Sequence, residues 1–410
     1  MQQPISANLS QKLTQYREAA NAEAKAILHW WAQNMPHPQQ AGFYGSIAAN
    51  GMADAEAPGS LVMYSRILWS FSAAAMHYRD AAYLDMAGRA LQALVHWFAD
   101  KEFGGLYWSV QHNGHVHNDK KQVYGMAFAI YGLSEYYRAT QHNHALQMAI
   151  ELYELLEQKN KQATGGGYLE AFSRNWDIPS DQRLSEKDAN ECKSMNTHLH
   201  VLEAYSNLYK VWPNDGLSAA IRSLLHIFEK HIIDAKSMRQ QLFFSENWQS
   251  KSTIISYGHD IEASWLLYEA ATLFHDPLLE EKWRHIAIEM ARAATVGLDA
   301  DGGMWYESEA DLLIKEKHWW PQAEAMVGFL NAWQLSADDA FARLSVNSFA
   351  FIQKHLLDTV NGEWHWGIDA MGMPMNLEKA GFWKCPYHNS RACMEVNRRL
   401  QKIGDTANPS

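Results

Sequence analysis

Apolar residues recur along this chain at helical spacing, and two kinds of helix alternate. In segment 81–99 they follow each other at intervals of three and four, which leaves a polar face. Segment 123–137 is apolar on nearly every side, and such a helix is buried on every side. The pattern therefore predicts about twelve helices that alternate between inner and outer positions. Segments 195–209, 261–273 and 323–333 resemble the buried kind, whereas 219–233, 279–293 and 340–356 resemble the half-polar kind.

Short glycine-aromatic segments separate these helices at a nearly constant period. Their first glycines are Gly42, Gly104, Gly166, Gly302 and Gly362, at intervals of 62, 62, 136 and 60 residues. The long interval is about twice a short one, and the aromatic segment 242–244 near its middle is interpreted as a marker without glycines. The chain thus divides into six units, and the markers themselves are expected to form small β-hairpins.

Six helical pairs with one buried member each predict an all-α fold, an (α/α)6 barrel with short β-hairpins in the connecting loops. An open solenoid is the alternative, but it needs polar capping repeats, and none is obvious in the sequence. Because no segment rich in Pro, Gly and Ser divides the chain, residues 1–410 are expected to form a single catalytic domain.

Composition excludes several classes of protein. The net charge is −11 and basic residues form no long stripe, which argues against nucleic acid as a partner. No run of about 18 apolar residues predicts a membrane span, and residues 1–6 do not resemble a signal peptide. The three cysteines match neither a disulfide framework nor a zinc motif. The reducing cytoplasm is therefore the expected compartment. A monomer is expected.

Polar and aromatic side chains lie at a similar phase near the starts of the predicted inner helices. From Arg66 onward, one such residue follows in each unit at intervals of 58, 72, 63, 61 and 68. If the ring is closed, these side chains face a common central pocket. The set comprises Arg66, Tyr124, Asn196 with His200, His259 with Glu262, Trp320, and His388.

Alternative interpretations exist for members of this set. His259 and Glu262 can form a satisfied pair within the core, and Arg66 can serve a structural carboxylate. Three histidines can bind zinc, but the HExxH arrangement is absent, so no metal is expected. A glycosidase needs two carboxylates across the pocket, for which Glu262 and Glu324 are available. Imidazoles dominate the set, however, and they suit proton transfer near neutral pH.

Four long segments carry a resemblance that covers nearly the whole chain. They read SMNTHLHVLEAY at 194–205, GHDIEASWLL at 258–267, HWWPQAEA at 318–325, and FWK followed by PYHN within 382–389. In these segments the chain resembles the N-acylglucosamine 2-epimerase superfamily, and most closely its members that act on disaccharides. The resemblance implies a six-hairpin barrel without metal or organic cofactor. It further implies epimerisation at C2 of the reducing-end glucose of β-1,4-linked disaccharides such as cellobiose and lactose.

The resemblance also implies roles for the candidate residues. His259 and His388 would flank C2 and exchange its proton through a cis-enediolate, while His200 would handle a proton at O1 or in ring opening. Arg66 would stabilise the enediolate oxygen. The remaining expected roles are hydroxyl binding by Tyr124 and Asn196, orientation of His259 by Glu262, and stacking of sugar rings on Trp320 and Trp383. Cys385 departs from the pattern, because a small residue such as glycine is expected there.

Three rival functions remain open at this stage. A monosaccharide aldose–ketose isomerase or an N-acylglucosamine 2-epimerase can use the same barrel. An isomerase moves a proton between C2 and C1 on one face, so one main base suffices. A barrel that binds sugar without catalysis predicts that cellobiose and lactose stay unchanged.

Overall fold

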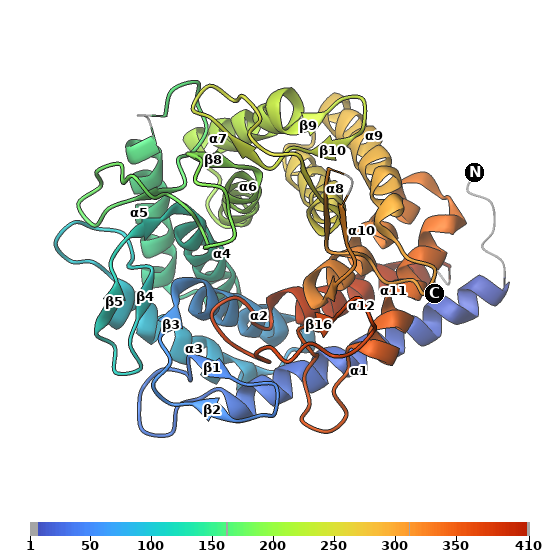
Figure 1. The fold of residues 1–410 in the computed structure, drawn as a ribbon, viewed down its shortest axis with the longest axis horizontal. Helices are drawn as coiled ribbons and strands as arrows, with labels where there is room; N and C mark the ends of the chain where they lie inside the picture. Colours follow the sequence, from blue (N-terminus) through green and yellow to red (C-terminus); the bar gives the residue numbers. More distant parts are fainter. Residues whose placement is uncertain (1–6, 161–162, 311, 408–410) are drawn as a thin grey trace.

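Twelve α-helices form a ring in the computed structural model, which describes residues 7–160, 163–310 and 312–407 (Figure 1). The predicted alternation of outer and inner helices, and with it the (α/α)6 barrel, is confirmed. The outer helices are α1 (Ala7–Asn34), α3 (Leu84–Ala93), α5 (Asn143–Asn160), α7 (Asp215–Ile227), α9 (Pro277–Ala294) and α11 (Asp339–His355). The inner helices are α2 (Leu61–Tyr78), α4 (Val123–Thr140), α6 (Met195–Tyr209), α8 (Tyr257–Thr272), α10 (Trp319–Ser336) and α12 (Tyr387–Ala407).

Burial separates the two rings as the hydrophobic pattern predicts. Every residue of α4 from Val123 to Glu135 is buried, because the helix packs against α2, α5 and α6. The outer helix α5 buries only a stripe at intervals of three and four, from Ala145 through Leu152 to Leu156. The core therefore lies between the two rings. None of the described helices is both long and apolar enough to cross a membrane.

Short strands join each unit to the next. The strand directly before an inner helix pairs with a strand that follows the outer helix of the next unit, in the pairs β3–β4, β6–β7, β8–β11, β12–β13 and β15–β16. The sixth unit meets the first through an antiparallel bridge between Ala380 and Ile47. The helices α1 and α12 also pack side by side. These contacts close the ring and exclude an open solenoid.

All described strands are two or three residues long and antiparallel. Their bounds are β1 (Ser46–Ile47), β2 (Ala53–Asp54), β3 (Gly59–Ser60), β4 (Ser109–Val110), β5 (Val116–Asn118), β6 (Lys121–Gln122), β7 (Ala171–Phe172), β8 (Lys193–Ser194), β9 (Ile233–Asp234), β10 (Arg239–Gln240), β11 (Phe243–Phe244), β12 (Ile254–Ser256), β13 (Glu307–Glu309), β14 (Leu312–Ile314), β15 (Lys317–His318) and β16 (Gly367–Ile368). Short helical turns of other types are η1 (Ala81–Tyr83), η2 (Leu94–Phe98), η3 (Phe228–Ile232) and η4 (Thr295–Gly297).

The predicted marker of the fourth unit was misplaced. At the glycine-aromatic marker of the second unit, the N–H of Gly104 donates to the carbonyl of Asp100 over 2.9 Å, and Gly104 has a φ of 73°. The equivalent turn of the fourth unit joins β9 to β10, where Met238 donates to Asp234 over 2.8 Å with a φ of 55°. A methionine thus adopts the left-handed conformation that glycine adopts most readily, which hid the marker from the sequence pattern.

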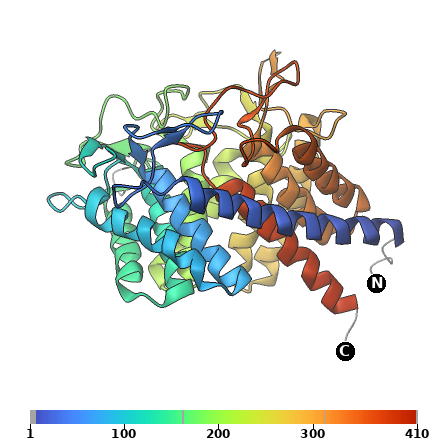
Figure 2. The same ribbon diagram turned by 90° about the horizontal axis from the view of Figure 1, so that it is seen from below.

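The strands and long loops gather at one end of the barrel, and the shorter helix connections lie at the other (Figure 2). Because each inner helix begins directly after this strand-rich layer, all six N-termini of the inner helices point toward the same end. Side chains from their first turns therefore converge on the barrel axis. Residues 1–6, in which no signal peptide is expected, lie outside the described residues.

Candidate active site

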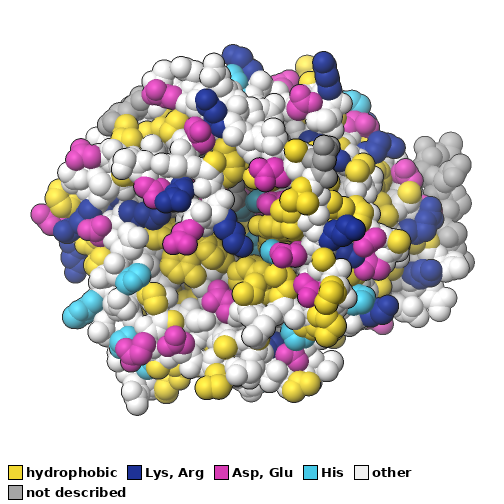
Figure 3. All heavy atoms as spheres, viewed as in Figure 1, with side chains coloured by type: hydrophobic (Ala, Val, Ile, Leu, Met, Phe, Trp, Pro, Cys, Tyr) yellow, Lys and Arg dark blue, Asp and Glu magenta, His cyan; other side chains and the backbone are white. Residues whose placement is uncertain are grey.

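The strand-rich face of the barrel is hollowed at its centre (Figure 3). The first two turns of the inner helices surround this hollow. These turns and the loop before α12 carry the residues that the sequence predicts for the site. Four of these side chains are partly exposed in an otherwise buried layer, which makes them the accessible part of the site. They are Asn196, His259, Trp320 and Trp383.

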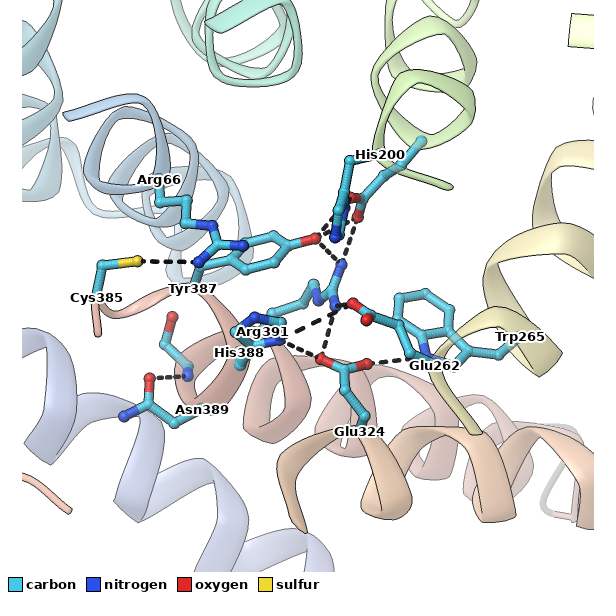
Figure 4. Close-up of polar contacts among 12 residues, drawn as sticks. Arg66, His200, Glu262, Trp265, Glu324, Cys385, Tyr387, His388, Asn389 and Arg391 are labelled. Carbon is cyan, nitrogen blue, oxygen red and sulfur yellow. Dashed lines mark hydrogen bonds and ion pairs between the residues drawn. The ribbon is translucent and has the colours of Figure 1, made fainter. Parts of the chain in front are cut away.

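Two of the three histidines are held by buried carboxylates. The Nδ1 atom of His200 lies 2.9 Å from Oε2 of Glu203 on the next turn of α6. The Nδ1 atom of His388 lies 2.7 Å from Oε1 of Glu324, which projects from α10 (Figure 4). A carboxylate at Nδ1 fixes the orientation of the ring and leaves Nε2 free to exchange protons with a substrate.

His259 is held by a serine, and the prediction that Glu262 orients it is wrong. The Nδ1 atom of His259 lies 2.8 Å from Oγ of Ser256, and the imidazole ring packs against Trp320 with 4.6 Å between centroids. Glu262 instead accepts a hydrogen bond from Nη2 of Arg391 over 3.1 Å. The spacing of three placed Glu262 and His259 on one helix, but a buried guanidinium on α12 holds the carboxylate.

The sequence analysis missed Arg391, which lies at the centre of the buried network. Its guanidinium pairs with Glu203, with Glu262, and with Oε1 of Glu324 over 2.7 Å. It also donates to the hydroxyl of Tyr387, which contacts Glu203 in turn. One cation therefore ties together three carboxylates from three helices, including the partners of both His200 and His388 (Figure 4).

Arg66 is almost fully buried beside this network and has no carboxylate partner among the described residues. Its Nη2 donates to the hydroxyl of Tyr124 over 2.9 Å, and its Nη1 contacts the Trp383 carbonyl oxygen at 3.3 Å. Its guanidinium also lies over the ring of Phe128 at 4.1 Å. A buried guanidinium held only by neutral groups keeps its positive charge available to an anionic ligand atom.

Cys385 contributes to the placement of Arg66. Its thiol sulfur lies 3.6 Å from Nη1 of Arg66, and burial raises the pKa of the thiol despite that nearby cation. The thiol is therefore a neutral packing partner for the guanidinium.

Aromatic rings and an amide complete the site. Trp320 contacts both catalytic candidates, with 4.6 Å to the ring of His259 and 5.8 Å to that of His388. Trp383 packs edge-on to Tyr124, and Oδ1 of Asn196 is buried without a hydrogen-bond partner in the structure. The site thus offers apolar faces and an unpaired polar atom, the combination that sugar rings with their hydroxyls require.

Glu262, Glu324 and His388 also offer atoms within 4.8 Å of one another, a spacing that can suit a metal ion. However, Nη2 of Arg391 already contacts both carboxylates. A positively charged group therefore occupies the position where a metal would bind.

Burial lowers the pKa of all three histidines. The pKa of His259 falls to about 3, from desolvation first and the neighbouring His200 second. That of His388 falls well below 6.5 because desolvation acts together with the positive charges of Arg66 and Arg391. That of His200 falls because desolvation outweighs its bond to Glu203. All three imidazoles are therefore neutral at pH 7, the form that accepts a proton.

These shifts predict an activity that persists in mild acid. A base with a lowered pKa stays unprotonated to lower pH, so protonation of these three rings should not reduce kcat/KM as the pH falls from 8 to about 6.5, the ordinary histidine value. A profile of kcat/KM against pH for the sugar substrate measures this directly. A tenfold decrease in kcat/KM per pH unit, with a midpoint at or above pH 7, would contradict the assignment of these rings as bases if it persists in Glu307→Gln, which removes a nearby carboxyl with a pKa of about 7.

Comparison with known proteins agrees with the fold. A family model described as N-acylglucosamine 2-epimerase (GlcNAc 2-epimerase) matches residues 42–392. A cellobiose 2-epimerase of Bacteroides fragilis is 43% identical over 373 residues, which cover 90% of this chain and 95% of that protein. A cellobiose 2-epimerase of Dictyoglomus turgidum is 35% identical over 91% of this chain and 96% of that protein.

Solved structures lead to the same class. The structure of cellobiose 2-epimerase from Spirochaeta thermophila matches with a TM-score of 0.91 and 38% identity, covering 97% of this chain and all of that one. That of a D-mannose isomerase, at 20% identity and a TM-score of 0.80, shares the fold. The barrel and its relatives define a carbohydrate epimerase. The chain belongs to the N-acylglucosamine 2-epimerase family.

Proposed function

We propose that this enzyme inverts C2 of the reducing-end glucose of β-1,4-linked disaccharides, converting cellobiose to glucosyl-mannose and lactose to epilactose. The observation that carries the proposal is the pair His259 and His388, which reach the same indole of Trp320 from different helices. Epimerisation removes a proton from one face of C2 and returns one to the other. Because one fixed base cannot serve both faces, two bases from separate helices suit this reaction. The relatives named as cellobiose 2-epimerases support the disaccharide as substrate.

The sugar ring must open before C2 becomes acidic. The proton on O1 leaves, the bond between C1 and O5 breaks, and O5 takes up a proton, which gives the open-chain aldehyde. We assign this transfer to His200, because its Nδ1 is bonded to Glu203 and its Nε2 remains free for the substrate. The pKa of Glu203 falls to about 2, since its interactions with Arg391 and His200 outweigh desolvation. This ionised carboxylate stabilises the imidazolium that forms transiently.

The C2 proton then passes to one imidazole, and the electron pair of the C–H bond forms a cis-enediolate with negative charge on O1. Once the negative charge of the enediolate has formed, the other imidazole takes up a proton from solvent and delivers it to C2 on the opposite face, and the first imidazole releases its proton to solvent. The two histidines exchange roles in the reverse direction. Arg66 stabilises the charged oxygen, because its guanidinium lacks an internal anionic partner among the described residues.

Binding of the disaccharide is assigned to three of the accessible residues and to the buried Tyr124. Trp320 and Trp383 present apolar faces for stacking, while Tyr124 and Asn196 bind hydroxyl groups. This chemistry proceeds without a metal or an organic cofactor, since imidazoles and a guanidinium supply every proton and charge.

Incubation with lactose or cellobiose in heavy water tests this function. The bases exchange their protons with solvent, so the product should carry a mannose-type reducing end with deuterium at C2, visible by proton NMR. Unchanged disaccharide after long incubation would refute catalysis. A keto sugar as the main product would favour the isomerase instead, and full retention of hydrogen at C2 would exclude exchange through solvent-accessible bases.

A further inference from the structure

Ser256 occupies a helix-cap position but makes no cap. In the equivalent positions before α2 and α6, Ser60 and Ser194 accept hydrogen bonds from the backbone N–H groups of Met63 and Thr197, at 3.0 and 3.1 Å. Ser256 precedes α8 in the same way, yet its side chain forms no cap hydrogen bond. Its hydroxyl lies 2.8 Å from the side chain of His259, the residue at the third helical position. The serine thus forgoes a stabilising cap to hold an imidazole.

A carboxylate stands on the other side of this serine. Ser256 in β12 and Glu307 in β13 are direct cross-strand partners, which places their side chains on the same face of the small sheet. Ser256 is buried, and its side chain lies close enough to the Glu307 carboxylate to lower the pKa of that group. Glu307 itself is half-buried. Ser256 therefore lies between Glu307 on the sheet and His259 in the site.

A hydrogen bond from the Ser256 hydroxyl to Glu307 would decide the tautomer of His259. A carboxylate can only accept, so a serine hydroxyl that donates to Glu307 must accept from Nδ1–H of His259. The proton of the neutral ring is then on Nδ1, and Nε2 presents a lone pair. Without the carboxylate, the hydroxyl can turn and donate to Nδ1, which moves the ring proton to Nε2 and removes the basic atom.

We propose that Glu307, acting through Ser256, is a positioning residue that keeps Nε2 of His259 unprotonated and aimed at the substrate. The inference rests on the proposed function of His259 as a base. His259 would then have a carboxylate partner, as His200 and His388 do, but the carboxylate would act through the hydroxyl of Ser256 instead of contacting the ring directly. Because no carboxylate contacts His259 directly, its imidazolium form is stabilised less than those of His200 and His388. His259 is therefore a weaker base than His388 in this respect.

Other charges face these groups and contribute to their titration. Burial first, and then Asp188, raise the pKa of Glu307 to about 7. Protonation of Glu307 near neutral pH therefore weakens its ability to accept from Ser256. The remaining groups that face the relay are Lys187 and Glu309 around Glu307, and His200 and Glu324 around His259.

Steady-state kinetics of three variants test the relay. Ser256→Ala should lower kcat by about 10- to 100-fold, the range seen when groups that orient metal-bound imidazoles are removed. Glu307→Gln should lower kcat by about 10-fold with KM within about 2-fold, and should remove from the pH profile any ionisation that belongs to Glu307. The control Glu309→Gln removes an equal charge from an exposed position two residues along β13, and should keep kcat within about 2-fold.

The tautomer can be read without turnover. Nitrogen-15 NMR of the unliganded protein, with His259 assigned by its absence in His259→Asn, should show Nδ1 protonated in the wild type and less so in Ser256→Ala. An unchanged tautomer with unchanged kcat in Ser256→Ala overturns the proposal. So does a raised KM with unaltered kcat in Glu307→Gln, which would place Glu307 on the substrate itself. If the wild type fails to epimerise, the proposed function is wrong. The NMR comparison of wild type and Ser256→Ala still tests whether Ser256 sets the tautomer of His259.

Discussion

Replacing His388 by asparagine should reduce epimerisation by about 10²- to 10⁴-fold, the usual contribution of a positioned acid–base group. The variant keeps a polar side chain of similar size but cannot exchange a proton at C2. Glu324 retains its bond to Arg391, so the buried network stays paired and the fold should persist. His259→Asn should lose activity to a similar extent. The measurement is the initial rate of deuterium incorporation at C2 in heavy water, with thermal unfolding as the check on folding.

The pattern across the two variants separates the rival reactions. His96→Asn, an exposed histidine on the outer ring, is the control and should retain wild-type rates. If either site variant still epimerises at near wild-type rates, the two-base assignment is wrong. If one variant loses epimerisation but keeps aldose–ketose isomerisation, a single base carries the proton between C2 and C1, and the enzyme is an isomerase.

The architecture was predictable because the repeat determines it. An inner helix buried on every side leaves a continuous apolar segment, and the expected bounds 195–209 coincide with those of α6. Closure of the ring was also foreseeable from the absence of polar capping repeats. The position of the glycine-aromatic marker in the fourth unit could not be predicted, because a methionine, Met238, adopts the left-handed backbone conformation there in place of a glycine. The strands that join consecutive units are only two or three residues long, too short for a periodicity to develop.

The site was predictable to the extent that residues share a repeat position. His259 and His388 stand at the same phase as Asn196, and His200 follows Asn196 by one helical turn, so the ring brings all three histidines to one end. Their partners were harder to foresee, because Glu324 and Arg391 reach the histidines across helices rather than along one. For Arg391 there was a signal: it follows His388 by three residues in an otherwise well-buried helix. Ser256 gave no signal, since a serine before a helix normally indicates a cap.

Replacing Arg391 by methionine should destabilise the protein by about 3–5 kcal/mol, the cost of removing one partner from a buried ion pair. Glu203, Glu262 and Glu324 would remain buried together without their shared cation. The matched control is Arg398→Met on the same helix, whose partly exposed guanidinium pairs with Glu395 and Glu269. A partly exposed pair contributes about 1 kcal/mol or less. Urea unfolding of both variants gives the comparison.

The pH dependence of this loss identifies its cause. The pKa of Glu262 lies well above its usual value, through burial first and the charge of Glu324 second, and that of Glu324 is raised by burial. Without Arg391 both folded-state pKa values rise further. A carboxyl whose pKa is higher in the folded state favours folding when protonated, so stability falls as the pH rises from about 4.5. The deficit of Arg391→Met should therefore be larger at pH 8 than at pH 5. A deficit equal at both pH values would indicate lost packing around the side chain instead of unpaired charge.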